Sequence, residues 1–173
     1  MKGIDAGEYA RELIKNATVA VKQEPKDFVN LKRVLSHAFM NTKAKGYSTA
    51  SIVSLKKHVL HGVNVGDSGL MLFRNNRMLF RSPIQQQKFN TPYQLGNGLK
   101  TDSPDSAMEY QMKAEGRLMN VQECAKEIAQ VARCLSICKL SGSPFEDACK
   151  KVGVNHKGGK IDDITVVVAH III

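Results

Sequence analysis

The 173-residue sequence is poor in several residue types, and each shortage argues against a class of protein. Its longest apolar run, residues 164–173, is interrupted by Thr165 and His170 and is too short to cross a bilayer. No two cysteines form a CxxC pair, which disfavours a zinc ribbon or a thioredoxin motif. We therefore expect free thiols in a reducing compartment at all four cysteines, Cys124, Cys134, Cys138 and Cys149.

Acidic residues are the scarcer charge, with 16 Asp and Glu against 25 Lys and Arg, which gives a net charge of +9. Residues 1–86 hold 14 basic and 6 acidic side chains, whereas residues 87–173 hold 11 and 10. Such an excess first suggests a nucleic acid or an acidic surface as a partner. The lysines between Lys43 and Lys57 lack the interleaved aromatic residues of a nucleic-acid groove, so we expect a solvated face and no nucleic-acid partner.

Hydrophobic residues make up an ordinary 43%, enough for one globular core. Their spacing predicts helices at residues 6–23, 25–43, 120–140 and 144–152. Strands are expected at residues 48–55, 58–65, 70–73, 78–80, 107–112 and 163–172. Runs of helix and runs of strand predict an α+β fold rather than a parallel α/β fold.

Three local signals refine this outline. Pro25 suits the first turn of the second helix. The Asn75-Asn76 pair tolerates positive φ and predicts a hairpin turn between two strands. Residues 82–103 contain two prolines and two glycines and are expected to form a long loop, and loops of this kind are often functional.

The first candidate for chemistry is Gly66-Asp67-Ser68-Gly69, between two predicted strands. A glycine on each side allows a tight turn and leaves the Asp67 carboxylate free to face a ligand or a cation. The alternative is a structural turn in which Asp67 caps backbone N–H groups. The spacing alone leaves both interpretations open.

The second candidate is the Asp162-Asp163 pair, which follows Gly158-Gly159 and leads into a very apolar stretch. Neighbouring residues of a strand point to opposite faces, so at most one of these carboxylates can face a given site. Hard divalent cations such as Mg²⁺ bind carboxylate oxygens held on rigid elements. The alternative is simply the polar start of a strand.

The third candidate is the segment of residues 81–96, whose glutamines, prolines and aromatic residues suit neither a helix nor a strand. Elsewhere, the five histidines form no cluster with ligand spacing, and the two serines at positions 68 and 82 have no visible base partner. Taken alone, the loop identifies no reaction.

In this order, the motifs resemble the metal-dependent protein phosphatases of the 2C type, especially their compact plant and organellar subgroup. Residues 46–50 are similar to the family's small-residue strand start, and residues 64–69 to its Asn-x-Gly-Asp-Ser element. Residues 82–96 resemble the subgroup's Gln-Gln-x-x-Phe-Asn-x-Pro-x-Gln-Leu loop. Residues 158–168 resemble the closing Gly-Gly-Lys-x-Asp-Asp-Ile-Thr-Val strand, and residues 3–7 the entry of the first helix, so the likeness covers nearly the whole chain.

The resemblance implies a two-layer antiparallel β-sandwich flanked by helices. It implies a phosphoprotein substrate whose phosphoserine or phosphothreonine is hydrolysed by a water activated between two Mn²⁺ or Mg²⁺ ions. It places the protein inside the cell, in the cytoplasm or in a plastid or mitochondrion. We expect a monomer with no membrane partner.

The resemblance also assigns residues. Asp162 matches an ordinary ligand of the two-ion centre, and Asp67 matches a carboxylate that lies near the centre and assists a further metal. The candidates for contact with the substrate lie in the loop, at Gln85, Gln86, Phe89 and Asn90.

Two family elements have no counterpart in the sequence. The first metal element, Asp-Gly-x-Gly-Gly, is absent, and a strand ending in an Asp-Gly motif is missing where Gly116 is followed at once by Arg117. We therefore predict a single partial domain over residues 1–173. One or two carboxylates cannot hold two divalent cations in fixed geometry, because water would supply most ligands. The hypothesis is a partial phosphatase domain with weak or no activity, and the alternative is a noncatalytic binding module that keeps the loop.

Overall fold

The computed structural model describes Asp5 and residues 7–75, 77–98, 101–113, 120–140 and 142–171. These residues form two compact units, one ending at Lys113 and the other starting at Asn120, and each unit is described by itself. Three predicted features involve residues outside the described ranges: the helix entry at residues 3–7, the Asn75-Asn76 turn and the Gly116-Arg117 junction. Among the described residues, no helix is long and apolar enough to cross a membrane.

The first unit opens with the two predicted helices, α1 (Glu8–Gln23) and α2 (Leu31–Asn41). The expectation that Pro25 lies in the first turn of α2 is wrong. The helix starts six residues later because Asn30 caps it, its side chain accepting a hydrogen bond from the Arg33 N–H at 2.9 Å. The Glu24 carboxylate fixes the intervening turn by accepting from the Asn30 N–H at 2.8 Å.

A three-stranded antiparallel sheet forms the centre of this unit, in the order β2–β3–β9. Its strands are β2 (Ala50–Lys56), β3 (Val59–Val65) and β9 (Met108–Lys113). The turn between β2 and β3 places Lys57 at a φ of 52°. These strands match the predicted ones, but the second neighbour of β3 is β9 rather than the next strand in sequence.

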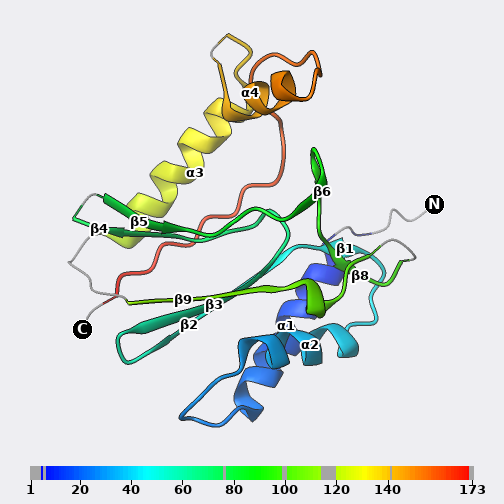
Figure 1. Cartoon of the computed structure of the whole chain (residues 1–173), viewed down its shortest axis with the longest axis vertical. Helices are drawn as coiled ribbons and strands as arrows, with labels where there is room; N and C mark the ends of the chain where they lie inside the picture. Colours follow the sequence, from blue (N-terminus) through cyan, green and yellow to red (C-terminus); the bar gives the residue numbers. More distant parts are fainter. Residues whose placement is uncertain are drawn as a thin grey trace. The chain divides into compact units, whose positions relative to one another are not determined.

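The next hairpin joins β4 (Met71–Arg74) to β5 (Arg77–Arg81), with Asn75 at a φ of 48° as expected for this turn. Figure 1 shows the hairpin and the three-stranded sheet as separate layers of the first unit. Phe80 of β5 contacts Tyr110 of β9, with ring centroids 5.3 Å apart. The ring of Tyr110 lies where a side chain on Gly62 would project, so the glycine leaves room for this contact between layers.

The region expected to be a loop contains short strands. They are β6 (Gln86–Lys88), β7 (Thr91–Pro92) and β8 (Leu95–Gly96), and β8 pairs with β1 (Tyr47–Ser48). A 3₁₀ turn at Pro104–Ser106 leads into β9. Strands of two or three residues carry too little periodicity to be recognised from sequence, which explains why the prediction was wrong here.

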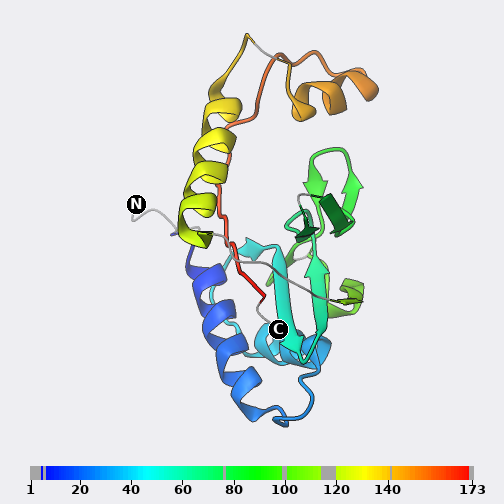
Figure 2. The same cartoon turned by 90° about the vertical axis from the view of Figure 1, so that its left-hand side faces the viewer.

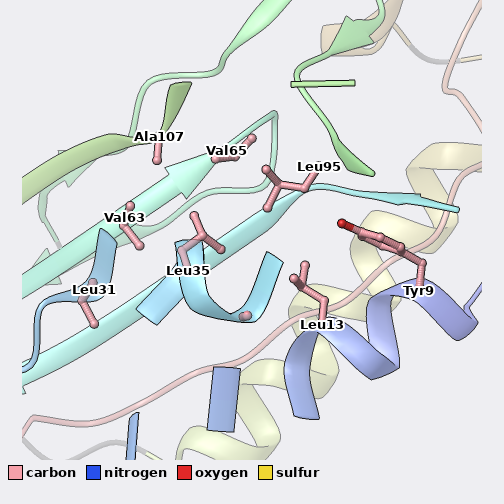
Figure 3. Packing of buried hydrophobic residues seen from close by; sticks show 9 residues of the cluster. Tyr9, Leu13, Leu31, Leu35, Val63, Val65, Leu95 and Ala107 are labelled. Atoms are coloured by element: carbon pink, nitrogen blue, oxygen red, sulfur yellow. The ribbon is translucent and has the colours of Figure 1, made fainter. Parts of the chain in front are cut away.

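The hydrophobic core of the unit lies between the helices and one face of the sheet (Figure 3). Tyr9 of α1, Leu35 of α2 and Val63 of β3 all have at most 1% of their surface exposed. Because side chains alternate along a strand, Val63 and Val65 face the helices while Gly62 faces the β4–β5 layer. Figure 2 shows α1 and α2 side by side next to the sheet.

The second unit contains the two predicted helices α3 (Val121–Ile137) and α4 (Pro144–Lys151). Asn120 caps α3 and Ser143 caps α4 through their side chains. The chain then returns to the end of α3, where the Gly159 N–H donates to the Cys138 carbonyl at 3.0 Å. None of the four cysteines, all of which the structure describes, is in a disulfide.

The strand expected at residues 163–172 is a further wrong prediction, because the described residues up to 171 form no strand. A strand needs a neighbouring strand with which to exchange backbone hydrogen bonds, and the second unit, taken by itself, contains no strand among its described residues. Several apolar side chains of this segment are exposed, with Val167 at 86%. The order of elements nevertheless confirms the predicted α+β class.

Candidate active site

The Gly66-Asp67-Ser68-Gly69 turn follows directly after β3 and is held in a conformation that requires glycine at its first position. Gly66 has a φ of +99°, which residues with a side chain rarely adopt. A Cβ atom at Gly66 would lie 2.5 Å from the Tyr93 carbonyl oxygen and from the Thr49 methyl group. The backbone at the start of the turn is therefore held in a conformation that only glycine adopts without strain.

Side chains of the sheet secure this turn. The Asn64 amide donates to the Gly66 carbonyl at 3.1 Å, and the Thr49 and Ser68 hydroxyls are 2.6 Å apart. Thr49 comes from the small-residue stretch before β2. The structure thus brings together two of the motifs that the sequence singles out.

Gln85 adds a third motif to the same place. Its backbone N–H donates to the Gly66 carbonyl, and its side-chain oxygen accepts from the Gly66 N–H, both at 3.0 Å. Its side-chain nitrogen donates to the Ser106 carbonyl at 2.7 Å. The family resemblance predicts Gln85 as a substrate contact, whereas in the structure both ends of its side-chain amide bind backbone groups, those of Gly66 and Ser106.

Asp67 lies at a hollow of about 150 Å³ whose wall also includes Arg81 and Ser82. Its carboxylate is exposed and, among the described residues, makes no hydrogen bond or ion pair. Ser82 is buried and its hydroxyl accepts from the Leu70 N–H at 2.8 Å, which fixes the wall. The Asp67 carboxylate therefore lies on an ordered turn and has no hydrogen-bond or ion-pair partner among the described residues.

The other loop candidates lie on the β6–β7 hairpin. Gln86 is exposed, Phe89 is half-buried, and Asn90 is exposed near the hairpin tip with a φ of 52°. The hairpin is closed at its base by the Tyr93 N–H, which donates to the Gln85 carbonyl at 3.2 Å. The loop is thus an ordered hairpin attached to the Asp67 turn through Gln85.

Asp162 belongs to the second unit and is described separately. It forms an ion pair with Lys160, and its other oxygen accepts from the Asp163 N–H at 3.1 Å. The hydrogen bond from Lys160 is the main cause that lowers the pKa of the Asp162 carboxyl, so the group is charged at neutral pH. Unlike Asp67, this carboxylate already has a cationic partner.

Whether these groups suit divalent cations depends on the number of oxygen ligands. A carboxylate oxygen is a hard donor, and Mg²⁺ often binds to one or two carboxylates and keeps several waters. Asp67 fits one such hydrated ion. The described residues bring no three Asp, Glu, His or Cys side chains together, so they do not fit a two-ion centre.

A larger hollow of about 360 Å³ in the second unit lies beside α4 and holds no sequence motif. Its one acidic side chain, Glu146, is already committed, since it pairs with Lys150 at 2.6 Å and accepts from the Gly158 N–H at 2.7 Å. Two residues near Asp67 were not predicted as site residues: Thr49, which binds the Ser68 hydroxyl, and Ser82, which binds the Leu70 N–H. The only signal for them in the sequence was their position within the recognised motifs.

Comparisons with known proteins point to one family, although no protein-family model matches the chain. It is 37% identical to probable protein phosphatase 2C 55 of Arabidopsis thaliana, over 98% of this chain and 42% of that protein. It is 33% identical to probable protein phosphatase 2C 80 of the same plant, over 48% of that protein. The chain thus spans less than half the length of these two relatives.

Length differences also appear inside the matched regions. The match to protein 55 extends over 198 positions, whereas 98% of this chain amounts to only about 170 residues. Roughly 28 positions of that relative therefore have no counterpart in this chain.

The fold has a solved counterpart. The X-ray structure of the photosystem II phosphatase PBCP superposes with a TM-score of 0.87, covering 98% of this chain and 84% of that chain at 24% identity. The protein phosphatase PTC7 homolog fig of Drosophila virilis is 32% identical over 96% of this chain and 68% of that protein. With this identity over two thirds of a relative, the chain belongs to the 2C-type protein phosphatases.

Proposed function

We propose that the protein is a metal-dependent protein serine/threonine phosphatase, with phosphoserine and phosphothreonine side chains of proteins as its substrate class. The observation that carries the proposal is the match to named phosphatases over nearly the whole chain. The ordered Gly66–Gly69 turn, with its uncommitted Asp67 carboxylate, supports it. Because the described residues do not fit a two-ion centre, we propose that these 173 residues turn over substrate only weakly.

Each candidate residue has a role within this proposal. Asp67 would hold a hydrated Mg²⁺ or Mn²⁺ ion, which supplies positive charge beside a phosphoryl group. Asp162 is proposed as a separate and weaker metal ligand, because an ion there has to displace Lys160 from the carboxylate. Gln86, Phe89 and Asn90 would contact the polypeptide around the phosphorylated residue, since they lie on the hairpin attached to the Asp67 turn.

A second candidate is a noncatalytic module that binds phosphoproteins without hydrolysing them. The specific observation in its favour is again the lack of three clustered metal-ligating side chains among the described residues. The hairpin and the hollow beside Asp67 would remain available for binding.

We also propose a monomer without a nucleic-acid partner, located in the cytoplasm, a plastid or a mitochondrion.

A phosphatase assay tests these alternatives. A phosphothreonine peptide is incubated with the chain and Mn²⁺, with a chelator in the blank. We expect slow release of phosphate that falls at least tenfold in Asp67→Asn, since removing a metal-ligating charge weakens the ion's hold. Asp27→Asn, an exposed carboxylate with no hydrogen bond to described residues, is the matched control and should keep the wild-type rate.

The outcomes separate the candidates. Phosphate release at a rate typical of intact phosphatases would contradict the expectation of weak turnover. Absence of release, together with saturable binding of the phosphopeptide but not of its unphosphorylated form, would favour the noncatalytic module. Absence of both would reject the two candidates together.

A further inference from the structure

We propose that Gln85 is a positioning residue that fixes the Asp67 carboxylate and connects it to the β6–β7 hairpin. The inference rests on the proposed function in one respect, that the ligand of Asp67 is a divalent cation. Everything else follows from the hydrogen bonds around Gly66. Asp67 itself makes no such bond among the described residues, so its position depends on what holds its neighbour.

The first step concerns Gly66, whose backbone is buried. A buried N–H and a buried carbonyl both need partners. Gln85 supplies both, because its side-chain oxygen accepts from the Gly66 N–H and its backbone N–H donates to the Gly66 carbonyl. The Asn64 amide is a second donor to that carbonyl, whereas Gln85 is the partner of the N–H.

The second step concerns the far end of the same amide. Its nitrogen donates to the Ser106 carbonyl, two residues before β9 begins. The side chain thus spans from the end of β3 to the start of β9. An amide suits this place because its acceptor and its donors are on two different atoms, oxygen and nitrogen. A hydroxyl side chain has both functions on one oxygen, and an aliphatic side chain has neither.

The third step concerns the hairpin. Gln85 directly precedes β6, and its carbonyl accepts from the Tyr93 N–H directly after β7. A shift of the hairpin base would therefore displace the groups that hold Gly66. Since coupling between two ligands is reciprocal, a peptide bound on the hairpin and a cation bound at Asp67 should each change the affinity of the other.

The test uses Gln85→Ala and Gln85→Glu, with Gln23→Ala as the matched control. Gln23 is an exposed glutamine at the end of α1, and its side chain makes no hydrogen bond to described residues. Gln85→Glu keeps the acceptor for Gly66 but loses the donor to Ser106, and it serves as the second variant if Gln85→Ala does not fold. Amide hydrogen exchange of residues 64–69 and Mn²⁺ affinity by calorimetry are measured on the full chain.

We expect Gln85→Ala to speed exchange in residues 64–69 by about tenfold, since one net hydrogen bond is lost. Mn²⁺ affinity should fall several-fold, and exchange in residues 50–63, the rest of the β2–β3 hairpin, should stay at the wild-type rate. Gln85→Glu should show a smaller effect on exchange, and Gln23→Ala should show no effect on either measurement.

Three results would overturn the inference. The first is wild-type exchange and Mn²⁺ affinity in Gln85→Ala. The second is faster exchange throughout β3 and β9, which would mean that Gln85 only stabilises the fold. The third is equal Mn²⁺ binding by wild type and Asp67→Asn, and it would also contradict the metal role proposed for Asp67. The first two results would leave the proposed function unchanged.

Discussion

At the scale of single residues, the candidate site depends on backbone geometry as much as on side-chain chemistry. Asp67 was recognisable from sequence because glycines flank it in a known motif. The residues that hold its turn were not, because Thr49, Gln85 and Ser106 lie 18 to 39 positions from Asp67 and reach the turn only in the folded chain. Local sequence gives the residue types of a turn, whereas its hydrogen-bond partners depend on tertiary structure.

Gly66→Ala tests the geometry of the turn. We expect it to destabilise the fold by about 2 kcal/mol or more, because a φ of +99° is strained for alanine and the new Cβ would meet the Tyr93 carbonyl. The free energy of unfolding in urea measures this. Gly142→Ala is the control, since nothing lies within 4 Å of its Cβ position, and it should change stability by less than about 0.5 kcal/mol. Equal effects of the two substitutions would contradict the account.

At the scale of elements, prediction succeeded where periodicity or turn chemistry was strong. The helices at α1, α3 and α4 and the β4–β5 hairpin were found within a few residues of their bounds. The start of α2 was misplaced because Pro25 is a good first-turn residue, yet the Asn30 cap and the Glu24 carboxylate fix the actual start. The last strand was expected from apolar composition, but composition does not provide a neighbouring strand.

Glu24 makes the connection between α1 and α2 sensitive to pH. Its side chain is 7% exposed, and its oxygens accept from Nε and Nη2 of Arg33, each at 2.7 Å. The Arg33 hydrogen bonds, with help from the Asn30 N–H, lower the pKa of Glu24 from 4.5 to about 2. A carboxyl with a lower pKa in the folded state stabilises the fold fully above pH 4.5 and loses this contribution as pH falls towards 2.

Glu24→Gln should therefore be less stable than wild type at pH 7, and the difference should shrink as pH falls from about 4.5 to 2. Thermal unfolding at a series of pH values measures it. Asp27→Asn, exposed in the same turn, should follow the wild-type profile at each pH. A constant difference between Glu24→Gln and wild type across this range would contradict the assigned role.

At the scale of the whole molecule, the family could be predicted from sequence because four motifs occur in the family's order. The metal centre could not, because the state of each candidate ligand depends on the folded chain, as the ion pair between Asp162 and Lys160 illustrates. The prediction of a single partial domain over residues 1–173 remains untested by the relatives, which are matched over 42% to 70% of their lengths in most cases and less in one.

The central claim is that the described residues provide one available carboxylate on an intact turn and not a two-ion centre. Calorimetric titration with Mn²⁺ tests it most directly, on the wild-type chain and on Asp67→Asn and Asp162→Asn. We predict at most one site, with a dissociation constant of order 10⁻⁴ M or weaker, because water supplies most ligands of the ion. This site should be lost in Asp67→Asn and kept in Asp162→Asn. Two tight sites in the wild-type chain would contradict the account.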